Sequence, residues 1–206
     1  GDNPIRHVTM SNLVIQGRIG IGLYAVPHPM GPVLHGTPID DVLGSQLTIE
    51  ASTSPLVAML RPESAAPASI RNVMLSQIRA VGSCGMVFYG SPELPIERMN
   101  LRDIHLTLRG RGLEDPVIHG PVPPLSGFGT ERVHIPHALY GRHLRNLKVT
   151  NLAVDWQQAE GPWDSAVRLD DSEKVALDGL DVTPAPQSKA GEAVQTRNVQ
   201  FRRGSL

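Results

Sequence analysis

The chain of 206 residues has little cysteine, few aromatic side chains and no long apolar run. Its single cysteine, Cys84, excludes an internal disulfide. Cys84 lies between Gly82 and Gly85 beside an apolar segment, which predicts a small buried side chain rather than a nucleophile. The apolar runs are much shorter than the roughly 18 residues that a transmembrane helix needs, so no membrane span is expected. The net charge of −1 comes without a basic stripe, which argues against a nucleic-acid partner.

Helix-forming segments are also scarce. The sequence contains 20 glycines and 18 prolines, and few windows lack both. Proline breaks helix interiors and central strands but is tolerated at corners and turns. The composition therefore favours an all-β chain with many turns, and the 40% apolar content is enough for one sizeable core.

One spacing pattern recurs seven times. Apolar residues occupy offsets +3, +5, +8 and +10 from a starting position, and Arg, Asn, Asp, Ser and Lys fill the places between them. Two short runs of period 2 indicate strands with one buried face. The seven starting positions are Ile5, Ile39, Ile70, Ile96, Leu144, Ser172 and Thr196.

A repeat of a few tens of residues built only from short strands is typical of a solenoid. We predict a right-handed parallel β-helix of about seven coils, formed by residues 1–206 as a single domain. Second apolar runs at 19–26, 55–60, 86–89 and 166–169 are assigned to another face of each coil. A long loop insertion is expected around residues 107–143. An antiparallel jelly roll would show more frequent turn signals and no shared register.

The first repeat begins at Ile5 without a preceding amphipathic cap. An open first coil leaves strand edges and stacking side chains uncovered. We therefore expect the chain to be the C-terminal part of a longer β-helix, with an N-terminal segment or another chain covering its first coil. Offset +7 holds mainly Asn, Gln and Asp, which fits either an amide ladder between coils or solvated turns.

Two segments carry a family resemblance. "HALYGRHLRNLKVTNLAVDW" and "DSAVRLDDSEKVALDGLDV" resemble the C-terminal coils of bacterial polygalacturonase-type proteins, glycoside hydrolase family 28 and its relatives. The close match covers residues 138–182, and "IRNVMLSQIRAVG" and "IERMNLRDIHLTLRGRG" are similar to the coils before it. The resemblance implies a pectin-lyase-type fold and action on an acidic polysaccharide.

The catalytic signature of that family is absent from this chain. There is no N-x-D, no G-H-G and no R-x-K, and neither Asp-Asp pair follows Gly or Gln. The carboxylates that remain to be considered as catalytic are Asp40, Asp41, Asp170 and Asp171. Neighbouring residues of a regular strand point to opposite faces, so solvated turns or bonds to turn amides are the alternative for both pairs.

Candidate substrate-binding residues cluster in the C-terminal half. Arg142 and His143, with Tyr140 beside them, suit a uronate carboxylate or anchor a loop. Trp156 and Trp163 bracket a loop and suit sugar stacking or the end of a core. The spacing of His134 and His137 does not match a zinc site, so no metal and no cofactor are expected.

The sequence thus predicts part of a carbohydrate-active β-helix protein, most simply a polygalacturonase-like hydrolase whose partner is a poly- or oligosaccharide. The alternative is a non-catalytic β-helix that binds glycans or builds an assembly, as tail-spike and surface proteins do. A periplasmic or secreted location fits this function, and the single cysteine is also compatible with the cytoplasm.

Overall fold

The computed structural model describes residues 4–25, 37–60, 68–109, 135–157, 163–186, 188 and 191–202. Within these ranges every regular element is a β-strand. The strands are β1 (Ile5–Gly17), β2 (Ile21–Ala25), β3 (Pro38–Ala51), β4 (Leu56–Leu60), β5 (Ser69–Gly82), β6 (Met86–Tyr89), β7 (Ile96–Arg109), β8 (His137–Arg142), β9 (Leu144–Gln157), β10 (Ser165–Asp181) and β11 (Val194–Phe201). The described part of the chain holds no helix, and therefore none long and apolar enough to cross a membrane.

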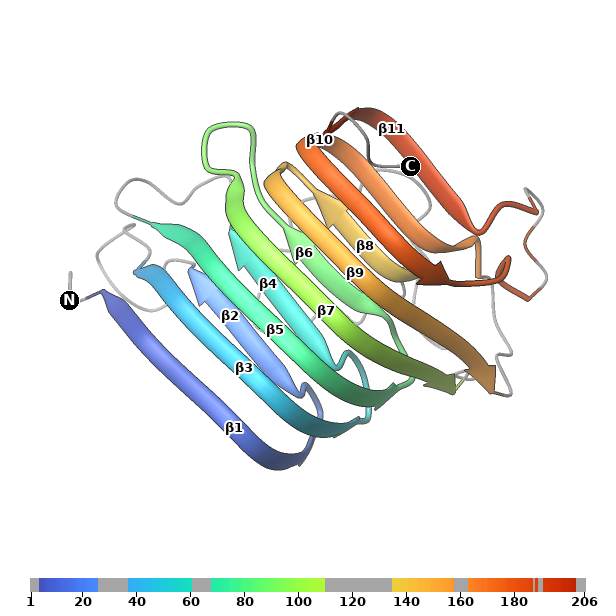
Figure 1. Ribbon diagram of the computed structural model, residues 1–206, viewed down its shortest axis with the longest axis horizontal. Coiled ribbons are helices and arrows are strands. Elements are labelled where there is room, and N and C mark those ends of the chain that lie inside the picture. The colour runs from blue at the N-terminus through green and yellow to red at the C-terminus, as the bar shows by residue number, and fades with distance from the viewer. Residues whose placement is uncertain are drawn as a thin grey trace.

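All strand pairs are parallel and form two ladders that share β10. The long ladder runs β1-β3-β5-β7-β9-β10, and the short ladder runs β2-β4-β6-β8-β10 and continues to β11. The chain alternates between the ladders as it advances, and Figure 1 shows the short strands lying behind the long ones. The result is one curled all-parallel sheet, as the repeat predicted.

The register confirms the predicted columns in six of the repeats. Ile5 pairs with Ile39, Ile39 with Ile70, and Ile96 with Leu144. The offset +3 column is equally regular, with Val8, Val42, Val73, Met99 and Leu147 in successive strands. Aliphatic residues therefore stack on aliphatic residues along each column and fill the interior, because each strand buries its apolar face only against its neighbours.

The predicted position of the seventh repeat is wrong by three residues. Thr196 pairs with Leu169, not with Ser172, and the residue opposite Ser172 is Val199. The reason is that β11 extends the short ladder first and reaches the long ladder only near its end, with an irregularity between Glu173 and Val175. Both Thr196 and Val199 fit an apolar or small inward place, so the spacing alone did not separate them.

Each long strand bends at two fixed places. Non-glycine residues with positive φ occupy offsets +2 and +7, for example Asp41 (φ 59°) and Gln46 (φ 55°) in β3. Asn and Asp tolerate this left-handed conformation better than most residues, which explains their frequency at these offsets. In β10 the second bend is Gly179, where a Cβ would collide with the side chain of Asn151 in the neighbouring strand.

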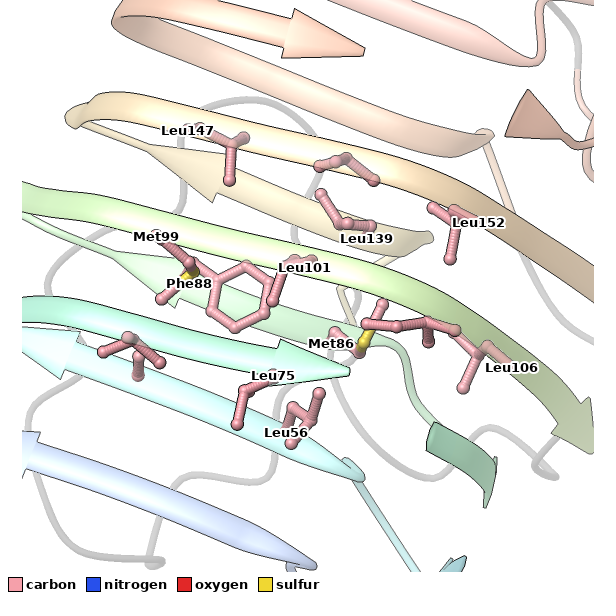
Figure 2. Packing of buried hydrophobic residues seen from close by; sticks show 14 of the residues in the cluster. Leu56, Leu75, Met86, Phe88, Met99, Leu101, Leu106, Leu139, Leu147 and Leu152 are labelled. Atoms are coloured by element: carbon pink, nitrogen blue, oxygen red, sulfur yellow. The ribbon is translucent and has the colours of Figure 1, made fainter. Parts of the chain in front are cut away.

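The hydrophobic core lies between the ladders. Figure 2 shows Met86 and Phe88 of the short ladder facing Met99, Leu101 and Leu106 of the long ladder. These side chains are almost completely buried. The short ladder also buries its other face, where Val57, Met59, Val87, Tyr89 and Tyr140 form a second cluster with Ile135.

The two ends of the predicted loop insertion at 107–143 are strand. β7 continues to Arg109, and residues 137–142 form β8 in the short ladder. Ala138 and Leu139 of β8 belong to the core cluster and Tyr140 to the second cluster, and β8 pairs with β6 and β10 to continue the short ladder. Residues 110–134 lie outside the described ranges.

Candidate functional site

An open groove crosses four neighbouring strands on the outer side of the long ladder. It has a volume of about 550 Å³ and follows offsets +7 to +9 of β3, β5, β7 and β9. Its lining residues are Gln46, Leu47, Thr48, Gln77, Ile78, Arg79, Asp103, Ile104, His105, Asn151 and Ala153. Since the strands are stacked about 4.8 Å apart, the groove presents one set of polar groups per coil.

The bend at offset +7 forms one wall of the groove. Gln46, Gln77, Asp103 and Asn151 all have φ between 52° and 55°. The Asn151 amide donates a hydrogen bond of 2.8 Å to Asp103. This hydrogen bond joins two adjacent strands at offset +7, the position where the sequence suggested an amide ladder.

Arg79 and His105 supply the other polar wall. They are register partners in β5 and β7, flanked by Thr48 and Ala153. The groove lining contains a single carboxylate, Asp103, which already accepts bonds from Asn151 and from Arg102 at 3.1 Å. The groove therefore offers a guanidinium, an imidazole and carboxamides to a ligand, but no pair of carboxylates.

Asp40 and Asp41 lie in β3 and are both bound by neighbouring coils. Asp40 lies between two arginines, at 3.7 Å from Arg6 and 3.1 Å from Arg71. Asp41 is 3.4 Å from His7 and accepts a hydrogen bond of 2.8 Å from Asn72. The pair thus joins β1, β3 and β5.

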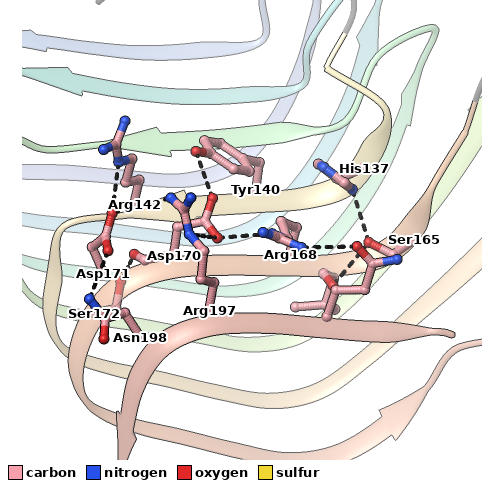
Figure 3. A network of polar contacts seen from close by, with 12 residues as sticks. His137, Tyr140, Arg142, Ser165, Arg168, Asp170, Asp171, Ser172, Arg197 and Asn198 are labelled. Carbon is pink, nitrogen blue, oxygen red and sulfur yellow. Dashed lines mark hydrogen bonds and ion pairs between the residues drawn. The ribbon is translucent and has the colours of Figure 1, made fainter. Parts of the chain in front are cut away.

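Asp170 and Asp171 form the corresponding pair in β10, shown in Figure 3. Asp170 is completely buried, with Arg168 at 2.9 Å and Arg197 at 3.5 Å. The Tyr140 hydroxyl donates to the same carboxylate at 3.3 Å.

Asp171 accepts hydrogen bonds from Arg142 at 3.2 Å and from Asn198 at 3.2 Å, and Arg197 lies 3.5 Å away. Burial opposes ionisation, but these hydrogen bonds and the charges of Arg142 and Arg197 outweigh it and hold the pKa of Asp171 below its ordinary value. Both carboxylates of this pair are therefore engaged by arginine side chains of the same or adjacent strands.

The two acid pairs share their neighbours as well as their own sequence. Arg-His lies in the paired strand that precedes each acid pair, as Arg6-His7 and Arg142-His143, and Arg-Asn lies in the paired strand that follows it, as Arg71-Asn72 and Arg197-Asn198. Sequence reasoning treated each Asp-Asp pair alone and missed these dipeptides. Their recurrence was visible in the sequence, and it also gives the correct register of Thr196 on Leu169.

The first acid pair belongs to a longer column of alternating charge. Offset +1 of successive long strands holds Arg6, Asp40, Arg71, Glu97, Arg145 and Glu173. Glu97 and Arg145 are 3.0 Å apart, and Arg145 and Glu173 are 3.3 Å apart. This alternation sets each charged side chain beside opposite charges in the coils above and below.

Three of the predicted substrate-binding residues lie beside Asp170 and Asp171. Tyr140 is completely buried and stacks on His137 with ring centroids 5.8 Å apart. Arg142 donates to Asp171 and lies 6.0 Å from the ring centre of Tyr89. Burial and the adjacent charge of Arg142 lower the pKa of His143.

The two tryptophans lie together near the end of β9. Their rings meet edge to face with centroids 5.1 Å apart. Trp163 is only 1% exposed and belongs to the core cluster, and Trp156 packs against that cluster half-buried.

His137 contacts Ser165 rather than a ligand site. Its Nδ1 lies 2.9 Å from the Ser165 hydroxyl, and both residues are buried. His134 lies outside the described ranges. Within those ranges no group of three or more His, Cys, Asp or Glu residues is placed to hold a metal ion.

No protein-family model matches the chain, and no curated protein or solved structure matches it either.

Proposed function

We propose that this chain is part of a right-handed parallel β-helix that binds an acidic polysaccharide in the groove between Gln46 and Asn151, without hydrolysing it. The alternating chain path and the rule that parallel crossovers are right-handed support the β-helix. The resemblance of residues 138–182 to polygalacturonase-type coils supports a uronate-containing ligand and a periplasmic or secreted location.

The observation that carries the proposal is the groove itself. It is open, runs across the coils, and repeats polar groups at the interval of the stacked strands. Carboxamides pair with sugar hydroxyls as donors and as acceptors. Arg79 and His105 add a guanidinium and an imidazole at the same level, and a guanidinium binds a carboxylate in a bidentate manner.

The carboxylates argue against hydrolysis by these coils. Inverting glycosidases need two carboxyl groups roughly 6.5–9.5 Å apart with a water between them. The groove contains Asp103 alone, and Asp40, Asp41, Asp170 and Asp171 are all engaged by residues of adjacent coils. The polygalacturonase-like hydrolase remains the second candidate because of the resemblance.

Binding to polygalacturonate by affinity electrophoresis or calorimetry tests the proposal, with a neutral glucan as the comparison ligand. Arg79→Ala should weaken binding of polygalacturonate roughly tenfold, since hydrogen bonds to charged groups contribute about 1.5–3 kcal/mol. Lys148→Ala is the matched control, because Lys148 is an exposed cation of β9 outside the groove. Equal losses in the two variants, or equal binding of the neutral glucan, would contradict the proposal.

Release of reducing ends from polygalacturonate distinguishes the two candidates. The proposal expects none above background. Release that disappears on substitution of Asp103, Asp40, Asp41, Asp170 or Asp171 would establish the hydrolase instead.

A further inference from the structure

The groove contains a cation that has no protein partner. Arg79 and His105 lie side by side on β5 and β7, and both side chains are exposed. Within the described ranges, neither side chain forms an ion pair or a hydrogen bond. Arg79 is the single Lys or Arg among the described lining residues. The groove therefore has one guanidinium available to an anionic group of a ligand.

One carboxylate lies in the same groove. Asp103 precedes His105 by two residues on β7 and lines the groove with it. Its hydrogen bonds to Asn151 and Arg102 fix its place in the wall. The lining thus holds equal numbers of arginines and carboxylates, whereas a site for a densely charged polyanion is expected to hold a row of cations.

Two further acids lie just outside the groove. Glu50 of β3 and Asp155 of β9 are exposed, and each lies two residues beyond the lining on its strand. Register places Glu50 diagonal to Arg79 and Asp155 diagonal to His105. Diagonal neighbours of adjacent strands have Cβ atoms about 7–8 Å apart. The available guanidinium is therefore surrounded by negative charge.

This arrangement treats the charges of a ligand unequally. A carboxylate bound at Arg79 gains a bidentate partner. A second carboxylate on the next sugar would lie close to Asp103, Glu50 or Asp155, and like charges at this range repel unless salt screens them. An uncharged sugar at the same place meets no repulsion, and its hydroxyls can pair with the carboxamides of Gln46 and Gln77.

We propose that the groove selects an acidic polysaccharide of low charge density, in which a carboxylate held by Arg79 is flanked by uncharged sugars. This inference rests on the proposed function and specifies its ligand. His105 and the carboxamides of the lining hydrogen-bond to hydroxyls beside the bound carboxylate. The three nearby acids reject additional charge, so that specificity comes from repulsion as well as attraction.

Oligogalacturonates of one length test the inference when they are prepared with all, about half or none of their carboxylates free and the rest as methyl esters. Calorimetry with the whole chain at low ionic strength measures their binding. We expect the half-esterified oligomer to bind roughly two- to fivefold more tightly than the fully charged one, the size of charge repulsion across 7–8 Å in water. The uncharged oligomer should bind most weakly, because Arg79 then has no carboxylate to hold. Added salt should reduce the difference between the two charged oligomers.

Charge-removing variants locate the repulsion. Asp103→Asn should strengthen binding of the fully charged oligomer more than that of the half-esterified one, and Asn tolerates the positive φ of this position. Glu50→Gln, outside the lining, should act in the same direction. Glu173→Gln is the matched control, because Glu173 is an exposed acid of β10 outside the groove, and it should leave the preference unchanged.

The outcomes separate this inference from the proposed function. Affinity that rises steadily with the number of free carboxylates would overturn the inference and leave binding of an acidic polysaccharide intact. The same conclusion would follow if Asp103→Asn and Glu50→Gln changed the preference no more than Glu173→Gln does. Equal binding of all three oligomers, or binding of none, would contradict the proposed function and the inference together.

Discussion

The two Asp-Asp pairs have the same neighbours in sequence and in space, but they lie in different surroundings. Asp40 and Asp41 lie in β3 of the long ladder, and their partners Arg6 and His7 in β1 are largely exposed. Asp170 and Asp171 lie where β10 passes from one ladder to the other. There Asp170 is completely buried, and Tyr140 adds a hydrogen bond that has no counterpart at Asp40 among the described residues.

The comparison separates two properties of a charge network. The partners of each carboxylate follow from the dipeptides that adjacent coils bring into register. The free energy that each network contributes follows from its exposure, because water and salt screen exposed ion pairs and leave buried ones strong but costly to break. The same sequence pattern thus gives one charge network that contributes little to stability, around Asp40, and one that contributes more, around the buried Asp170.

Removing the first carboxylate of each pair should give the largest contrast. Asp170→Ala removes a completely buried carboxylate that pairs with Arg168 and Arg197 and accepts from Tyr140, which should lower the free energy of unfolding by about 3–5 kcal/mol. Asp40→Ala should cost about 1 kcal/mol, because Arg6 and Arg71 remain substantially exposed to water. Urea unfolding of the two variants measures both values, and equal losses would show that exposure does not govern the difference.

The second carboxylates sharpen the comparison at low pH. The pKa of Asp171 in the folded protein lies below its ordinary value of 3.8, so the folded state binds fewer protons than the unfolded state. Its contribution to stability is therefore present above about pH 4 and is lost as the pH falls through the folded pKa. We therefore expect the free energy of unfolding of Asp171→Asn to fall less steeply than that of the unchanged protein when unfolding is measured over a series of acidic pH values.

Asp41→Asn is the matched control, because Asp41 also bonds to an Asn of the following coil. If the free energy of unfolding of Asp171→Asn falls with decreasing pH as steeply as that of the unchanged protein, the proposed role of Arg142, Arg197 and Asn198 is contradicted.

The histidines that precede the acid pairs should show the smallest effect. Burial, followed by the charge of Arg142, lowers the pKa of His143 below 6.5, while the charges of Asp171, Glu93 and Asp170 oppose the shift. The folded state again binds fewer protons, so the contribution is present above pH 6.5 and is lost as the pH falls. Imidazole resonances followed by NMR should titrate below 6.5 for His143, and a midpoint at or above 6.5 would contradict the burial argument.

The interior of the fold could be predicted because its signal is local. Ile39, Ile70 and Ile96 recur with the same offsets to the next aliphatic residues, and stacking makes that spacing sufficient to fix their columns. The predicted position of the seventh repeat was wrong because Thr196 and Val199 both suit an inward place, and the pairing of Arg197-Asn198 with Asp170-Asp171 distinguishes them.

The polar sites depend on register between remote residues. Apart from Arg168, which is two residues from Asp170, the partners of Asp170 and Asp171 are 26 to 30 positions away, and the spacing of acids along one strand says nothing about them. The β8 strand was hidden for a related reason. Ala138, Leu139 and Tyr140 of this strand are divided between two apolar clusters and five of its six residues are buried, so it lacks the alternation of polar and apolar residues that marks a half-exposed strand.

Each of the six long strands has a pair of bends five residues apart, at 7 and 12, 41 and 46, 72 and 77, 98 and 103, 146 and 151, and 174 and 179, and β10 has a further positive φ at Asp171. The number of residues between the two bends is therefore constant, whereas the number of residues between successive long strands varies. An inserted or deleted residue between the bends would displace a corner from the stack and would affect both neighbouring coils. The connections between ladders carry no such requirement, so natural variation in length, and any grafted loop, belongs there.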